Sequence, residues 1–155
     1  MQFRPDGAKL HRQFASLFAG SFLVLSLAIG HAQPPPGECP QPRFTGKAPD
    51  EYYNLVNPLT NYSNKVAERL YLGKAGNFGC ATCHGKKGDG KGPMAKQFDP
   101  RPRNFACAQT VNGIPDGQLF WIIRFGSPGT AMPSHPDFTD QQVWELVAYL
   151  RHLAN

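Results

Sequence analysis

The sequence predicts a small, loop-rich helical domain preceded by an irregular proline-rich arm. Three segments, near residues 64–73, 115–125 and 139–153, space their apolar residues every three or four positions, as helices with one buried face do. Fifteen prolines and sixteen glycines make up about a fifth of the chain, which is typical of long connecting loops. A length of 155 residues limits the chain to one domain with tails.

The middle of the chain carries a motif with a specific chemistry. Residues 80–84 read Cys-Ala-Thr-Cys-His. Two thiols separated by two residues can reach the two vinyl groups on one edge of a porphyrin, and the following His lies beneath the ring, where it can bind iron. The motif therefore predicts a covalently attached c-type haem. A dithiol redox motif needs no such His, and a zinc site needs a second paired cluster, whereas Cys39 and Cys107 are single residues far apart.

The first 32 residues have the pattern of a secretory signal peptide. Three basic residues precede an apolar run over 14–30, and a small-x-small site ends at Ala32. The run is shorter than the roughly 20 residues that span a bilayer, although an uncleaved N-terminal anchor is the alternative. We therefore expect export to the periplasm with cleavage near Ala32, and contact with a membrane only if this segment stays uncleaved.

The charge excludes one class of partner. The formal net charge is +5, and removal of the leader leaves 13 basic against 10 acidic residues, a balance of +3. Haem carboxylates would bring the charge nearer to zero. Nucleic-acid binding is therefore not indicated.

Residues 33–63 form the N-terminal extension, which we call the arm. Its seven prolines exclude a continuous helix or a central strand. Several apolar residues, such as Tyr52 and Leu55, predict that the arm packs onto the main domain or onto a partner. In an oxidising compartment Cys39 is expected to form a disulfide with Cys107. Two free buried thiols are the alternative.

The domain proper is expected over 64–155. Its first helix carries Val66, Ala67, Leu70 and Tyr71 on one stripe and ends at Gly73. Between residues 85 and 93 a glycine-rich loop is expected to pass close to a flat ligand. The extended segment 100–105 follows, in which Arg101, Arg103 or Asn104 either meets a haem propionate or lies in a solvated basic loop.

Two further helices complete the domain. The second begins near Pro115, carries an apolar stripe from Leu119 to Phe125, and ends at Gly126. The aromatic pair at 120 and 121 either walls the cofactor or fills the core. The third begins with the capping box of Thr139 and Gln142 and continues as an amphipathic helix.

The residue opposite His84 on the iron decides the chemistry, because a closed iron favours electron transfer and an open one binds small ligands. The candidates are Met94, Met132, His135 and His152. Met132 lies 48 residues after His84, on a loop bounded by prolines that is able to cross to the other face of the ring. It is the preferred ligand, and His135 is the second choice.

These motifs together resemble the class I c-type cytochromes. The resemblance covers residues 64–154 and rests on Cys80-Ala81-Thr82-Cys83-His84-Gly85, the glycine loop, Met132-Pro133 and the closing helix around Trp144 and Tyr149. It implies an all-α, cytochrome c-like helical wrap around one haem bound through two thioethers, with Cys80, Cys83, His84 and Met132 as site residues. The arm and its cysteine depart from the shortest members of the family.

The expected function is one-electron transfer between periplasmic redox partners, without catalysis by the chain itself. The alternatives are a dedicated cytochrome subunit of a larger periplasmic oxidoreductase, which docks through the arm, and a haem enzyme or gas sensor with a displaceable Met132. Partners are expected to dock at a basic haem edge that contains Lys86, Lys87, Lys91 and Lys96.

Overall fold

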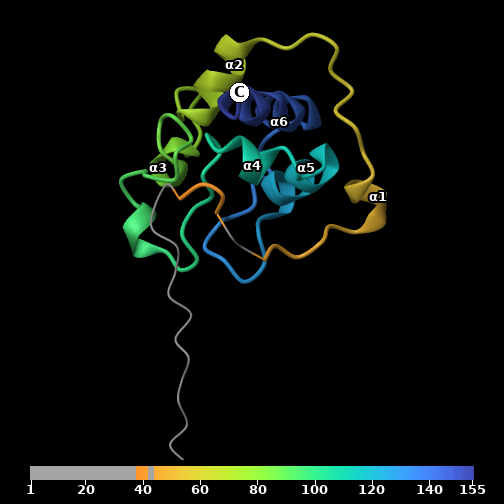
Figure 1. Cartoon of the computed structure of the whole chain (residues 1–155). Helices are drawn as coiled ribbons and strands as arrows, with labels where there is room; N and C mark the ends of the chain where they lie inside the picture. The colour runs from red at the N-terminus through yellow and green to blue at the C-terminus, as the bar shows by residue number, and fades with distance from the viewer. Residues whose placement is uncertain (1–37, 42–43) are drawn as a thin grey trace, which may run out of the picture. The chain divides into compact units, whose positions relative to one another are not determined.

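The fold consists of helices and long connections. The computed structural model describes residues 38–41 and 44–155, so the expected signal peptide lies outside the described residues. Within these ranges there is no β-strand, and the helical class expected from the sequence is confirmed. The longer helices are α2 (Asn64–Tyr71), α5 (Asp116–Phe125) and α6 (Asp140–Leu153), and the short ones are α1 (Asp50–Tyr53), α3 (Ala81–His84), η1 (Ala95–Gln97) and α4 (Ala108–Val111) (Figure 1).

Helices α2 and α6 pack against each other and carry much of the core (Figure 1). Ala67, Leu70 and Tyr71 of α2 are buried, and the Tyr71 ring lies 5.4 Å from that of Tyr149 on α6. Each such large side chain contributes roughly 1.5–3 kcal/mol by leaving water. The expectation that Val66 belongs to the same stripe is wrong, because Val66 lies on the outer side of this short helix and is exposed.

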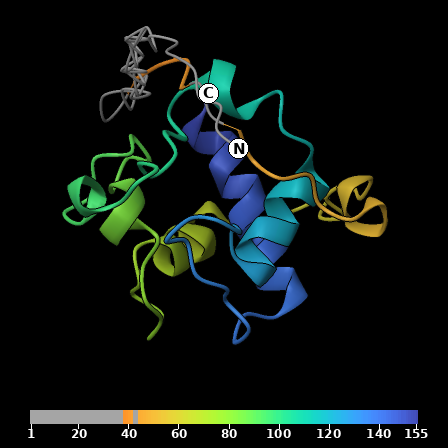
Figure 2. The same ribbon diagram turned by 90° about the horizontal axis from the view of Figure 1, so that it is seen from below.

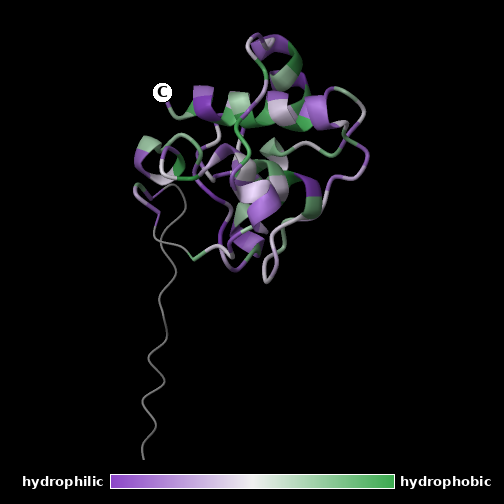
Figure 3. Cartoon of the chain, turned by 90° about the vertical axis from the view of Figure 1, so that its right-hand side faces the viewer, coloured by the Kyte–Doolittle hydropathy of each residue, from purple (hydrophilic) through white to green (hydrophobic). Residues whose placement is uncertain are grey.

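Helix α6 begins with the predicted capping box. The Thr139 hydroxyl accepts from Gln142 N at 3.3 Å, and Gln142 Oε1 accepts from Thr139 N at 2.8 Å, so two N–H groups at the helix start are satisfied. Hydrophilic and hydrophobic residues alternate along the helix, which ends at the C label in Figure 3. Its buried side includes Val143, Leu146 and Val147, which confirms the predicted amphipathic helix.

Helix α5 lies against α6 and ends, as predicted, at Gly126, whose φ of 84° suits glycine (Figure 2). Phe120 is buried and its ring lies 4.4 Å from that of Trp144, so Phe120 fills the core. Phe125 was expected on the buried stripe but is half-exposed: it is the last residue of α5, where its ring meets those of Tyr52 and Trp121.

Arg151 connects α6 to the link between α4 and α5. Its guanidinium forms a half-buried ion pair with Asp116 at 2.7 Å and donates to the carbonyl oxygens of Val111 and Ile114. Hydrogen bonds from a charged donor contribute about 1.5–3 kcal/mol each. The α4–α5 link is therefore fixed to the C-terminal half of α6, a contact that no sequence pattern indicated.

The described part of the arm packs onto its own domain. Helix α1 lies against α5, where a Cβ on Gly117 would come within 1.8 Å of the Tyr52 carbonyl oxygen. The buried Gln118 side chain accepts from Ala48 N at 2.7 Å and donates to the Gly46 oxygen at 3.0 Å. Two adjacent residues of α5 thus provide the space and the hydrogen bonds that seat the arm.

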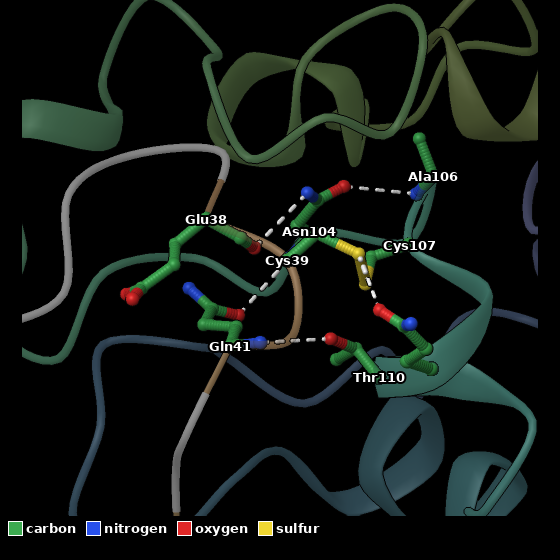
Figure 4. The surroundings of a disulfide bond; sticks show 8 residues. Glu38, Cys39, Gln41, Asn104, Ala106, Cys107 and Thr110 are labelled. Atoms are coloured by element: carbon green, nitrogen blue, oxygen red, sulfur yellow. Dashed lines mark hydrogen bonds between the residues drawn. A yellow bond between two sulfur atoms is a disulfide. The ribbon is translucent and has the colours of Figure 1, made fainter.

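A disulfide between Cys39 and Cys107 joins the start of the described arm to the residue before α4, with the two Cα atoms 5.5 Å apart (Figure 4). Around it Gln41 N donates to Thr110 Oγ1 at 3.0 Å, and Asn104 N donates to Gln41 Oε1 at 3.1 Å. The arm is therefore held at this point by covalent and polar contacts together.

We predict that replacing both cysteines, Cys39→Ala with Cys107→Ala, lowers the free energy of unfolding by up to about 4 kcal/mol, because the bond closes a loop with a sequence separation of 68. Urea unfolding followed by far-UV circular dichroism measures the change. Gln109→Ala, an exposed neighbour, is the control and should unfold like the parent. A double variant as stable as the parent would show that the cross-link contributes nothing.

Candidate functional site

A cavity of about 880 Å³ lies at the centre of the predicted site. This volume is within the range of roughly 300–1,000 Å³ that cofactor pockets have. Its walls come from α3, the segment 98–105, α5, the loop that precedes α6, and the arm. Segments far apart in the sequence therefore meet around one space.

The motif residues lie together on one wall of this cavity. Cys80 is the N-cap of α3 and already has helical dihedral angles, and His84 N donates to the Cys80 carbonyl at 2.8 Å. Residues four apart in a helix lie on the same face. The side chains of Cys80, Cys83 and His84 accordingly all line the cavity.

The two thiols do not have the properties of a redox pair or a zinc site. Burial raises the pKa of Cys80 to about 11 and also raises the pKa of Cys83 above its ordinary value, so both are neutral thiols at pH 7. They are not joined to each other. Among the residues that the structure describes, no group of three or more His, Cys, Asp and Glu side chains gathers as a metal site.

The orientation of His84 is fixed by one hydrogen bond and one ring contact. Its Nδ1 lies 2.9 Å from the Arg103 carbonyl oxygen, which can only accept, so Nδ1 carries the proton. The Phe105 ring stacks on the imidazole at 4.4 Å. Nε2 therefore keeps its lone pair and is the nitrogen available to a metal.

The glycine-rich loop packs against the motif itself. A Cβ on Gly92 would come within 2.5 Å of the Thr82 carbonyl oxygen, and Gly92 does not line the cavity. The Gly85 carbonyl accepts from the buried Tyr71 hydroxyl at 2.8 Å. The close approach that the sequence predicted is confirmed, and the motif itself is the close neighbour of Gly92 in the structure.

Of the four candidate ligands opposite His84, Met132 and His135 line the cavity, whereas Met94 and His152 do not. The Met132 loop is held by hydrogen bonds within itself: Ser127 N donates to the Met132 oxygen at 3.2 Å, and Met132 N donates to Thr130 Oγ1 at 3.1 Å. His135 stacks on Phe138, and burial lowers its pKa. The structure thus narrows the choice to two residues on one loop.

The chemistry of the walls suits an amphipathic ligand. Apolar side chains from α5 and α6, including Ile122, Ile123 and Leu150, line one part of the cavity. Polar and charged residues of the arm and of segment 98–105 line another, namely Gln41, Thr45, Lys47 and Arg103. Two neutral thiols, an oriented imidazole, an apolar wall and a cationic end together match the chemical groups of a haem.

A family model described as Cytochrome c matches residues 68–154. The chain belongs to the cytochrome c family. This membership confirms the expected family and its all-α fold, and it implies a covalently bound haem c.

Among solved structures, a chain of the reducing HAO-like protein complex from Kuenenia stuttgartiensis shares the fold, with a TM-score of 0.53 and 24% sequence identity. The alignment covers 65% of this chain and 50% of that chain, so the protein spans about half the length of its structural neighbour. A comparison with curated proteins found none that matches.

The cytochrome c domain places the lysines of the expected docking edge outside the cavity wall. Lys86, Lys87, Lys91 and Lys96 are all exposed, and none lines the cavity. The lysine and arginine side chains that do line it, among the described residues, are Lys47 and Arg103.

Sequence reasoning missed the contribution of the arm to the site. Gln41 is buried and lines the cavity, as does Thr45, although neither lies in a recognisable motif. The one signal that pointed to this region was Cys39, since a pairing with Cys107 places the start of the arm beside segment 98–105. Arg103, in contrast, was among the residues expected near the propionates, and it does line the cavity.

Proposed function

We propose that the protein is a periplasmic electron carrier that holds one haem c, with thioether bonds to Cys80 and Cys83 and with His84 and Met132 as axial ligands. The observation that carries this proposal is that all four side chains line the same cavity. The cytochrome c family supplies the cofactor class, and the arrangement of these residues supplies the ligand set. When bound, the haem supplies an iron that alternates between the ferrous and ferric states.

The residues of the chain favour a closed iron and a high potential. Nε2 of His84 is oriented by the Arg103 hydrogen bond, and Met132 is held in its loop by hydrogen bonds with Ser127 N and Thr130 Oγ1. Methionine as the second ligand raises the reduction potential relative to a second histidine. The apolar wall around Ile123 and Leu150 disfavours the more highly charged ferric site and raises the potential further.

Export to the periplasm is part of the same proposal. It rests on the signal pattern that ends near Ala32 and on the disulfide between Cys39 and Cys107, a bond that persists in oxidising compartments. Within residues 38–41 and 44–155, no helix has both the length and the apolarity needed to cross a bilayer.

Covalent attachment is the first prediction of this function. The exported protein should keep its pigment through acid–acetone extraction, because thioether bonds survive a treatment that releases a haem held only by its axial ligands. Replacement of both motif cysteines, Cys80→Ala with Cys83→Ala, should abolish that retention, whereas the Cys39→Ala, Cys107→Ala variant serves as a control and should retain the pigment. Loss of the pigment from the unaltered protein would refute covalent attachment.

The second prediction concerns the axial methionine. The oxidised protein should show the weak long-wavelength absorption band of methionine–iron coordination, and Met132→Ala should lose it and bind imidazole or cyanide more tightly, since the position opposite His84 opens. His135→Ala is the matched control from the same loop and should keep the band. Loss of the band in His135→Ala but not in Met132→Ala would assign the ligand to His135. An unaltered protein whose iron has no ligand opposite His84 would favour an enzyme or a sensor.

The third prediction concerns docking. Lys86 and Lys87 lie two and three residues after His84 and are exposed, so we propose that they steer an acidic partner toward the haem edge. Electron transfer to the native partner should slow steeply as salt approaches 0.15 M, where the Debye length is about 8 Å. Charge reversal by Lys86→Glu with Lys87→Glu should slow it similarly at low salt.

The control for docking is Lys65→Glu with Lys74→Glu, which makes the same charge change at two exposed positions on and just after α2. Equal slowing by both pairs would mean that net charge matters and not this edge. A rate that responds neither to salt nor to Lys86 and Lys87 would favour the alternative of a subunit held permanently in a larger oxidoreductase.

A further inference from the structure

The arm lies before the part of the chain that the family model matches, yet it forms part of the cofactor cavity. The family match begins at residue 68, whereas residues 38–41, Thr45, Lys47 and Tyr53 all line the cavity. These residues bring side-chain oxygen and nitrogen atoms to a site whose α5 and α6 walls are mainly apolar. The family domain alone would therefore leave this end of the cavity without the polar side chains of the arm.

Arg103 connects the arm to the axial histidine. Its carbonyl oxygen accepts the proton of His84 Nδ1 at 2.9 Å. Its guanidinium donates through Nη2 to Thr45 Oγ1 in the arm at 2.7 Å. A single residue in an extended segment thus contacts the arm with its side chain and orients the imidazole with its backbone.

The ligand proposed for this cavity carries two carboxylates, and a carboxylate removed from water requires a cation or several hydrogen bonds. Among the described residues, the ionisable side chains that line the cavity, besides the thiols and Tyr53, are Glu38, Lys47, His84, Arg103 and His135. Lys47 is mostly exposed, and its charge is offset by Asp50 at 2.6 Å. Arg103 is half-buried, and its planar guanidinium suits a carboxylate, so it is the stronger candidate.

The arm segment that contacts Arg103 is fixed on both sides. Before Thr45, Cys39 is bonded to Cys107, and Gln41 donates a hydrogen bond to Thr110 and accepts one from Asn104. After it, Gly46 and Ala48 are held by the buried Gln118 of α5. The Thr45 hydroxyl is therefore a fixed acceptor, and a fixed acceptor limits the positions that the guanidinium adopts.

We propose that the arm completes the haem site by holding Arg103, through Thr45, against a haem propionate. This inference rests on the proposed function, since it requires a haem bound at Cys80, Cys83 and His84. Arg103 acts as a cofactor-binding residue and Thr45 as a positioning residue. A cation held near the iron disfavours the ferric state, so the arm raises the reduction potential of the protein.

The test is a redox titration of the purified holoprotein and five variants. Arg103→Gln should lower the midpoint potential by about 59 mV, which corresponds to a tenfold change in a one-electron equilibrium. Thr45→Val keeps the shape of the side chain but removes its acceptor, and it should give a smaller fall. Thr45→Ser restores the hydroxyl and should match the parent. Arg101→Gln makes the same change two residues away, at a side chain that does not line the cavity, and should leave the potential unchanged.

A second readout reports the contact directly. The propionate bending modes in the resonance Raman spectrum should shift in Arg103→Gln and in Thr45→Val, but not in Arg101→Gln. Arg103→Lys, which keeps the charge without the planar fork, should retain most of the potential and still shift these modes. If Arg103→Gln does not fold, the potentials and Raman spectra of Thr45→Val and Arg103→Lys test the contact between Arg103 and the propionate.

The outcomes separate this inference from the proposed function. Covalent haem and the methionine band are measured in every sample, and their absence from the parent protein would refute the function itself. If both are present while Arg103→Gln behaves like Arg101→Gln, or Thr45→Val behaves like the parent in both measurements, the electron-transfer function stands and the role of the arm is wrong.

Discussion

The structure depends on one turn of helix, α3, which fixes two thiols and an imidazole on the same wall of a cavity. The turn is too short to be stable alone, because helix nucleation costs several fixed residues for one hydrogen bond. It is held by tertiary contacts on several sides. Tyr71 of α2 donates to the Gly85 carbonyl, Gly92 packs against Thr82, and the Arg103 carbonyl receives the proton of His84. The role of the surrounding chain is thus to hold this turn, and these contacts explain the glycines that follow it.

The contacts that hold α3 also determine how the cavity is enclosed. The packing of α2 on α6 supplies the rigid base, and α5 lies against α6 so that Ile122 and Ile123 reach the cavity. Arg124 extends this arrangement by binding the Phe138 carbonyl and the Asp140 carboxylate, which secures the chain that leads from Met132 to α6. A ligand bound between two such fixed walls needs little rearrangement when its charge changes, and this property suits the electron transfer proposed for a member of the cytochrome c family.

The arm gives the cavity a wall that the family domain lacks. It is seated by Gln118, by the space above Gly117 and by the disulfide to Cys107, and its Thr45 meets Arg103. Each of these contacts joins residues about 50 to 75 positions apart in the chain. The arm contacts Arg103, the same residue whose carbonyl oxygen orients His84. The shape of the polar end of the cavity and the orientation of the imidazole therefore depend on one another.

The sequence by itself determined the helical class, the haem motif and the approximate bounds of the three longer helices, because these follow from local spacing, caps and breakers such as the Thr139 capping box and Gly126. It also reduced the candidate sixth ligands to four residues. Only the tertiary structure decided that Met94 and His152 lie away from the cavity, that Val66 and Phe125 lie outside the core, and that the glycine loop packs on α3. It alone showed that Gln118 seats the arm, that Arg151 fixes the α4–α5 link and that Thr45 contacts Arg103. The physical reason is that a polar side chain acquires such a role from partners distant in the sequence, and no local periodicity encodes those partners.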